Sequence, residues 1–201
     1  MKTTTKFFTA LLILVSFTPA LRAEPTLPPA QDFSLTGSDG KTHTLSEAKG
    51  KFVVLEWTNH QCPFVNKFYS SGEMQKLQKK FTAKGVVWYS IVSSAPGKEG
   101  YVTADDVVKI REQQKTASTA TLLDPDGKVG RLYNAKTTPD MFVINPEGKI
   151  IYFGAIDSIP SVNSADIPKA VNYVEQTLNS ALAGHSPSVG STKSYGCSVK
   201  Y

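Results

Sequence analysis

Residues 53–65 read VVLEWTNHQCPFV, a run that begins apolar and ends just past a Cys-Pro pair. Residues 52–57 are almost wholly apolar, which is typical of a strand buried on both faces of a sheet. From residue 63 to residue 84 the apolar side chains recur at roughly helical spacing, with Gly72 placed to kink the helix. We therefore expect a buried strand, a short loop and a helix, with Cys62 where the helix begins.

The regions on both sides of this run show the same alternation of element types. The pattern predicts a β-hairpin at 32–45, strands at 86–92, 120–123, 140–144 and 150–153, and helices that begin at Thr103 and cover 167–183. Strands that alternate with helices favour an α/β fold with three layers and one central sheet. We assign residues 24–31 as a proline-rich lead-in, residues 32–183 as one domain and residues 184–201 as a C-terminal tail that carries Cys197.

The N-terminus has the pattern of an export signal. Lys2 and Lys6 precede an apolar run at 7–17, and Ala23 offers a small residue for cleavage. The alternative is a membrane anchor, but the run has about 11 residues where a membrane span needs roughly 20. We predict a signal peptide at 1–23, no membrane span after its cleavage, and a periplasmic or secreted protein.

Composition excludes several function classes. The chain has 201 residues, and its 22 Lys and Arg against 17 Asp and Glu give a net charge of +5, which falls to +2 once Lys2, Lys6 and Arg22 are cleaved off. Nucleic-acid binding needs a clustered basic face, so no nucleic-acid partner is expected. Two cysteines are too few for a disulfide scaffold or a four-cysteine zinc site, and no metal or cofactor is expected.

Cys62 stands where a helix terminus affects thiol chemistry. Free amide groups and the helix dipole favour negative charge at a helix N-terminus, and they increase the fraction of a cysteine that is present as nucleophilic thiolate. Pro63 follows directly, and its fixed backbone angle suits a first helical turn. The alternative is an inert buried cysteine. His60 lies two residues earlier and could form a thin soft-metal ligand set with Cys62, but a solvent-facing loop histidine is the simpler interpretation.

Cys197 lies four residues from the C-terminus, in the tail. Such a tail is mobile unless it is tied down, and 13 residues separate Gly184 from Cys197. An extended tail of that length reaches roughly 40 Å. Two cysteines in an exported chain suggest an attacking thiol and a resolving thiol. A permanent disulfide that pins the tail is the alternative, and both hypotheses predict that the bond forms.

The run at 53–65 resembles the thioredoxin-like superfamily, and within it the peroxiredoxin-like branch (redoxin, alkyl hydroperoxide reductase/thiol-specific antioxidant). The hairpin residues 33–41, the segment 123–129, Thr138-Pro139 before a strand, and the turn 145–150 follow in the order of that family. The resemblance implies a four- or five-stranded mixed sheet flanked by helices, with Cys62 as the redox cysteine. It also implies that Pro139 is a cis-proline whose loop faces the reactive sulfur.

The chain departs from its apparent relatives at several positions. Thioredoxin-type reductases carry Cys-x-x-Cys, but Asn59 and Val65 stand three residues on either side of Cys62. Peroxiredoxins place Thr and Pro where this chain has Asn59 and Leu55, together with a distant Arg over the thiolate. Arg131 is the candidate for that last position, although a solvated helix face is the simpler explanation for it.

The sequence therefore predicts an exported, thiol-dependent oxidoreductase of peroxiredoxin-like type. Cys62 would reduce a peroxide and Cys197 would resolve the sulfenic acid, while Asn59, Pro63 and Pro139 contribute to substrate binding. The expected partners are a small-molecule peroxide or disulfide substrate and an external dithiol protein that restores both thiols. A disulfide carrier that acts on protein partners, and a non-catalytic domain with a Cys62–Cys197 disulfide, remain the two alternatives.

Overall fold

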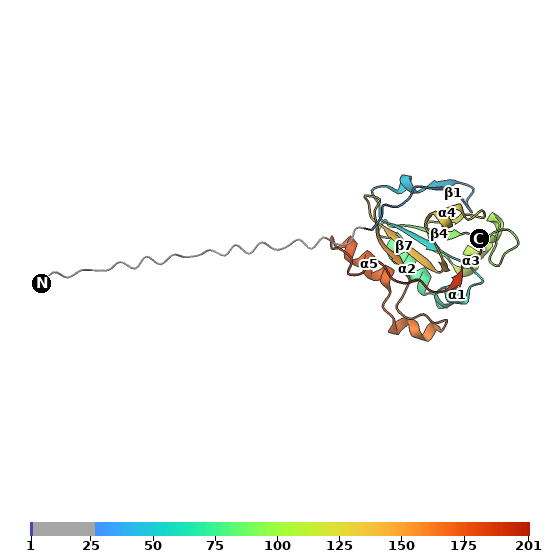
Figure 1. The fold of residues 1–201 in the computed structure, drawn as a ribbon. Helices are drawn as coiled ribbons and strands as arrows, with labels where there is room; N and C mark the ends of the chain where they lie inside the picture. Colours follow the sequence, from blue (N-terminus) through green and yellow to red (C-terminus); the bar gives the residue numbers. More distant parts are fainter. Residues whose placement is uncertain (2–26) are drawn as a thin grey trace.

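The computed structural model describes Met1 and residues 27–201, so the predicted signal peptide lies outside the described residues except for Met1. A sheet forms the centre of the fold (Figure 1). It has seven strands in the order β2-β1-β5-β4-β3-β7-β8. Its strands are β1 (Ser34–Gly37), β2 (Thr42–Thr44), β3 (Val53–Trp57), β4 (Val87–Val92), β5 (Ala120–Leu123), β7 (Asp140–Ile144) and β8 (Ile150–Gly154). Within the described residues, no helix combines the length and the apolar character that a membrane crossing requires.

The sheet is mixed. Strand β3 runs parallel to β4 and β4 runs parallel to β5, whereas β1 and β7 join the sheet antiparallel to β5 and β3. All five residues of β3 are buried, as its apolar sequence predicted. The sheet has more strands than the four or five that the resemblance implied, and the predicted hairpin β1–β2 adds two of them at the β5 edge.

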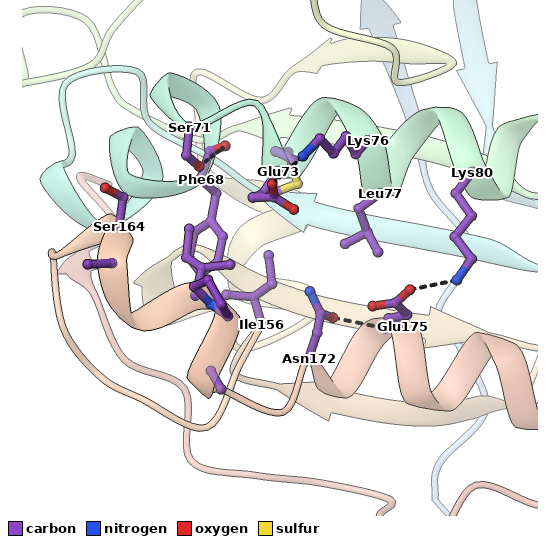
Figure 2. Close-up of a pocket in the computed structure, with 15 residues that line it drawn as sticks. Phe68, Ser71, Glu73, Lys76, Leu77, Lys80, Ile156, Ser164, Asn172 and Glu175 are labelled. Atoms are coloured by element: carbon purple, nitrogen blue, oxygen red, sulfur yellow. Dashed lines mark hydrogen bonds and ion pairs between the residues drawn. The ribbon is translucent and has the colours of Figure 1, made fainter.

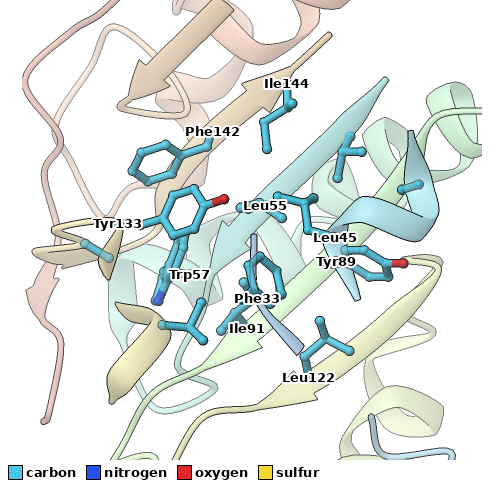
Figure 3. Close-up of a cluster of buried hydrophobic side chains, with 14 of the residues drawn as sticks. Phe33, Leu45, Leu55, Trp57, Tyr89, Ile91, Leu122, Tyr133, Phe142 and Ile144 are labelled. Atoms are coloured by element: carbon cyan, nitrogen blue, oxygen red, sulfur yellow. The ribbon is translucent and has the colours of Figure 1, made fainter. Parts of the chain in front are cut away.

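Helices and loops cover both faces of the sheet. The helices are α1 (Pro63–Ser70), α2 (Glu73–Thr82), α3 (Ala104–Gln114), α4 (Lys128–Leu132) and α5 (Tyr173–Leu182), with 3-10 helices at Leu45–Ala48 and Ser164–Lys169. Side chains alternate along β3, so that Val54 packs with α1, α2 and α5. Leu55 and Trp57 face the opposite way, into an aromatic cluster with Tyr133 and Phe142 (Figure 3).

Two helices differ from the sequence prediction. The helix expected at 63–84 is two helices, because Gly72 adopts a left-handed backbone with φ of 80° and begins α2 afresh. The helix expected at 167–183 begins only at Tyr173, because Pro168 lies in the 3-10 turn before it. Helix α4 and the two-residue strands β6 (Thr137–Thr138) and β9 (Cys197–Ser198) were not predicted.

Candidate active site

Cys62 begins α1 at the carboxyl end of the central strand β3. Its backbone is extended, with φ of −74° and ψ of 124°, and Pro63 occupies the first helical turn. The backbone amide of Asn66 donates to the Cys62 carbonyl at 2.9 Å, which closes that turn. Cys62 is buried, with 0% of its surface exposed, among the apolar residues below α1. The sulfur is therefore shielded from bulk solvent yet lies at a helix N-terminus.

The loop before β7 lies directly over this sulfur. The Thr138–Pro139 peptide bond is cis, as the resemblance implied. The Cys62 thiol donates to the Thr138 carbonyl oxygen at 3.1 Å. Strands β6 and β9 pair antiparallel with Thr138 opposite Cys197, and both cysteines are free thiols. The cis-proline loop thus brings together two cysteines that lie far apart in the sequence.

The C-terminal segment, residues 184–201, is fixed along its course rather than free. The Thr192 hydroxyl contacts the Tyr152 hydroxyl at 2.7 Å and accepts a hydrogen bond from the Ala155 amide at 3.0 Å. At the other end, the Tyr201 hydroxyl donates to the Ala135 carbonyl at 2.7 Å. The Tyr201 ring lies 4.5 Å from the Arg131 guanidinium, so this arginine contacts the end of the tail rather than covering Cys62.

The pKa values of the two thiols are shifted in opposite directions. Burial raises the pKa of Cys62, but hydrogen bonds from the Cys197 thiol, the Thr138 hydroxyl and the Val65 amide outweigh it, so the pKa lies below its ordinary value. Burial and the neighbouring Cys62 sulfur raise the pKa of Cys197 to about 12. The anion of the pair therefore resides on Cys62, and the Cys197 thiol donates a hydrogen bond to it.

Thr138 contributes a second polar group that sequence reasoning did not single out. Its hydroxyl is buried. In the described structure, in which Cys62 is a protonated thiol, this hydroxyl neither donates nor accepts a hydrogen bond. Once Cys62 loses its proton, this hydroxyl is placed to donate to the thiolate, which agrees with its effect on the Cys62 pKa. Only the Thr138-Pro139 dipeptide in the sequence pointed to this position.

Asn59 lies in the loop between β3 and Cys62, and its side chain forms hydrogen bonds with Glu99 and the Gln61 backbone. Its amide nitrogen donates to Glu99 at 3.4 Å, and its amide oxygen accepts from the Gln61 backbone at 2.8 Å. Gly100 packs so closely on this side chain that a Cβ there would lie 2.3 Å from the Asn59 amide oxygen. Asn59 thus holds the cysteine loop against Glu99 and Gly100, and its part in binding substrate stays a prediction, as does that of Pro63 and Pro139.

The buried carboxyl group of Glu56 lies beneath helices α1 and α2. Glu56, the one charged residue of β3, is 0% exposed and accepts hydrogen bonds from Trp88 (2.7 Å), Tyr69 (2.8 Å), Gln78 (3.1 Å) and Ser90 (3.1 Å). Burial raises the pKa of Glu56, and the four donors act in the opposite direction. This set of donors ties α1 and α2 to the centre of the sheet.

A second buried acid follows the cis-proline. Burial raises the pKa of Asp140 to about 6, while hydrogen bonds from the amides of Lys136 and Thr137 and from the Ser194 hydroxyl partly offset the rise. Asp140 lines a cavity of about 590 Å³ whose apolar side includes Phe142 and Phe153.

Burial also lowers the pKa of His60, so this histidine is neutral at physiological pH and adds no positive charge near Cys62.

A second groove lies away from the two cysteines. It has a volume of about 670 Å³ and runs between α2 and the chain before α5 (Figure 2). Phe68, Leu77 and Ile156 form its apolar floor, and the Lys80–Glu175 ion pair, at 2.6 Å, closes one end. Neither cysteine lines this groove, so it is separate from the thiol chemistry.

Comparisons with known proteins identify the family and the fold of the chain. The model of the AhpC/TSA family matches residues 28–153. Thiol-disulfide oxidoreductase ResA of Bacillus subtilis (strain 168) is 30% identical over 122 residues, which make up 61% of this chain and 63% of the relative. A conserved protein of Geobacillus kaustophilus has a similar structure (TM-score 0.75, 25% identity, 88% of this chain and 92% of that one). A putative thioredoxin of Neisseria meningitidis is 18% identical with a TM-score of 0.55, over 77% of this chain and 89% of that one. The protein has a thioredoxin-like fold and belongs to the AhpC/TSA family.

Proposed function

We propose that the protein is a thiol-dependent oxidoreductase in which Cys62 attacks the oxidant and Cys197 resolves the product. The observation that carries this proposal is the β6–β9 pairing, which places Cys197 opposite Thr138, the residue whose carbonyl contacts the Cys62 sulfur. The lowered pKa of Cys62 makes it the nucleophile of the pair. The raised pKa of Cys197 keeps it protonated until the second step.

With a peroxide as substrate, the two thiols carry out the reduction in two steps, and an external dithiol then restores them. The Cys62 thiolate attacks one peroxide oxygen, the O–O bond breaks, and the departing alkoxide or hydroxide takes up a proton. Cys62 is then a sulfenic acid. The Cys197 sulfur attacks it, an S–S bond forms, and the sulfenic oxygen leaves as water with the Cys197 proton. A dithiol protein then supplies the two electrons that restore both thiols.

Exchange with protein partners is the second candidate function, and the similarity to ResA favours it. Cys62 is wholly buried, whereas Cys197 is partly exposed. A partner thiolate would therefore attack Cys197 in the disulfide form, and Cys62 would depart. Since thiols of lower pKa leave faster, the acidity of Cys62 suits it to be the leaving group. The mixed disulfide with the partner is expected on Cys197.

One set of assays separates these functions from a structural disulfide. Purified protein is tested for hydrogen peroxide consumption with a dithiol reductant and, separately, for thiol–disulfide exchange between its disulfide form and a reduced dithiol protein. A peroxidase shows turnover in the first assay that Cys62→Ser abolishes, while Cys197→Ser accumulates over-oxidised Cys62. A carrier shows turnover in the second assay alone. Absence of turnover in both assays would leave a cross-linked, non-catalytic domain.

We further infer that the protein works outside the cytoplasm, where a disulfide can persist between turnovers. The support is the charged and apolar pattern of residues 1–23. Mass spectrometry of the mature N-terminus after expression in a bacterial host tests it, and a chain that keeps Met1 in the cytosolic fraction would contradict it.

A further inference from the structure

We propose that Lys67, Asp157 and Tyr195, hereafter the Asp157 cluster, position Cys197 against Cys62 and thereby set the equilibrium between the dithiol and the disulfide. The proposal rests on the proposed function, because it concerns the same two thiols. It adds three positioning residues that touch neither sulfur. Their effect on the chemistry would pass through the geometry of the C-terminal segment.

The cluster begins on the helix that Cys62 starts. Lys67 lies on α1, and its ammonium group donates to Asp157 at 3.1 Å and to the Ile159 carbonyl at 3.2 Å. The Lys67 side chain is 0% exposed and that of Asp157 is 2% exposed. Isolated burial of either charge would be costly, so each requires the other and fixed hydrogen bonds. Removal of one partner would leave the other charge buried and unpaired, so the pair holds α1 and Asp157 in one relative position.

The same carboxylate holds the C-terminal segment. The Tyr195 hydroxyl donates to the Asp157 oxygen that Lys67 does not bind. The Tyr195 ring also packs edge-on against Phe64, with ring centres 5.8 Å apart. Phe64 lies two residues after Cys62, and Tyr195 lies two residues before Cys197. Asp157 therefore links the helix that carries one thiol to the segment that carries the other.

The residue between Tyr195 and Cys197 leaves little freedom to compensate. Gly196 has φ of 141°, and a Cβ there would lie 2.1 Å from the Thr138 carbonyl oxygen. The segment thus lies directly against the loop that contacts Cys62. A shift of Tyr195 would pass along this short connection to Cys197. The anchors at Thr192 and Tyr201 remain, so the segment would stay attached while the Cys197 sulfur lost its fixed place.

The test compares two Tyr→Phe substitutions. Tyr195→Phe removes the donor to Asp157 but keeps the ring against Phe64. Tyr133→Phe is the matched control, because its hydroxyl also donates one hydrogen bond, to the Gln31 carbonyl at 2.5 Å, in a hydrophobic cluster that contains neither cysteine. Each full-length protein is equilibrated with glutathione buffers of graded ratio. The fraction of Cys62–Cys197 disulfide is then measured by mass spectrometry after acid quenching and alkylation.

We expect Tyr195→Phe to lower the equilibrium constant for disulfide formation by about tenfold, the effect of one hydrogen bond to a charged group. Tyr133→Phe should change it less than about twofold. An unchanged constant in Tyr195→Phe, or an equal change in both variants, overturns the proposal and leaves the proposed function intact. Failure of the wild-type protein to form the disulfide at all overturns both.

A double substitution tests whether Tyr195 acts through Asp157. Asp157→Asn weakens the acceptor, and Tyr195→Phe removes the donor of the same hydrogen bond. If the bond is the cause, the double variant loses no more of the equilibrium constant than the stronger single variant. Effects that multiply would show that the two residues act independently, which contradicts the proposed cluster.

Discussion

The Cys62 sulfur lies 3.1 Å from the carbonyl oxygen of Thr138, and Thr138 pairs across the β6–β9 ladder with Cys197. One residue next to the cis-proline thus contacts one thiol and pairs with the residue that bears the other. This arrangement replaces the local Cys-x-x-Cys motif with two segments that meet only in the folded chain. The reactivity of Cys62 should therefore depend on both Thr138 and Cys197.

Removal of the Cys197 thiol should raise the pKa of Cys62. In Cys197→Ala the hydrogen bond to the Cys62 thiolate is lost, whereas in Cys197→Ser a hydroxyl donor remains. The rate of iodoacetamide alkylation of Cys62 against pH measures the effect, since only the thiolate reacts. We expect the midpoint to lie higher in the Ala variant than in the Ser variant. Equal midpoints would show that Cys197 does not stabilise the thiolate.

Thr138→Val should also raise the pKa of Cys62, because valine keeps the shape of threonine but has no hydroxyl. The Thr138 hydroxyl makes no hydrogen bond in the described structure of the dithiol form, so the fold should lose little stability. Thr137→Val is the matched control, since the Thr137 hydroxyl bonds the Pro139 carbonyl at 3.1 Å instead. The same alkylation profile is the measurement. A shift of equal size in the control would contradict the role of Thr138.

Gly196→Ala should separate the two cysteines. The new methyl group would overlap the Thr138 carbonyl, and the positive φ of 141° disfavours any other side chain. We expect slower disulfide formation with peroxide and faster modification of Cys62 by bulky maleimides. Gly190→Ala in the same segment is the control, because its Cβ would meet Leu27 only at an ordinary 3.5 Å. Disulfide formation at the wild-type rate in Gly196→Ala would rule out the close approach of β9.

Asp140 should make the protein less stable as the pH rises from about 4 to about 6. Its pKa of about 6 in the folded protein exceeds the ordinary value of 3.8, so the folded state binds more protons than the unfolded state in that range. The free energy of unfolding therefore falls by on the order of 3 kcal/mol as Asp140 loses its proton. The loss is complete above about pH 6 and absent below about pH 4. Urea unfolding of wild type and Asp140→Asn at several pH values measures it. A difference between the two proteins that does not vary with pH would contradict the raised pKa.

Glu56→Ala should destabilise the fold by about 3–5 kcal/mol, because Trp88, Tyr69, Gln78 and Ser90 would lose a common acceptor in a buried site. Glu56→Gln keeps one acceptor oxygen and should cost clearly less. Urea unfolding monitored by tryptophan fluorescence compares the two variants. Similar losses in both would indicate that the charge, rather than the hydrogen bonds, holds the network.

The central strands and the first helix were predictable because long apolar runs such as that of β3 have one stable placement, between two layers. The place of Cys62 at a helix start followed from the same pattern. Strands β6 and β9 were not predictable, since two residues carry no periodicity. The fixed C-terminal segment depends on contacts of Thr192, Tyr195 and Tyr201 with residues far away in the chain, which spacing cannot show.

Two glycines also show that local sequence patterns do not reveal contacts between distant parts of the chain. Gly72 was expected to kink a helix, and its left-handed backbone divides that helix in two. Gly196 gave no local signal, because its requirement comes from the Thr138 carbonyl across the β6–β9 ladder. The ion pair between Lys67 and Asp157 was invisible for the same reason, since its two residues belong to separate elements.

The most direct measurement is a single-turnover oxidation of the fully reduced protein with one equivalent of hydrogen peroxide. Rapidly quenched samples are alkylated, digested and mapped by mass spectrometry. We predict that Cys62 is oxidised first, that a Cys62–Cys197 disulfide within one chain follows, and that Cys197→Ser stops at oxidised Cys62. Oxidation that begins at Cys197, or a Cys62 that stays reduced while the protein remains folded, would contradict it.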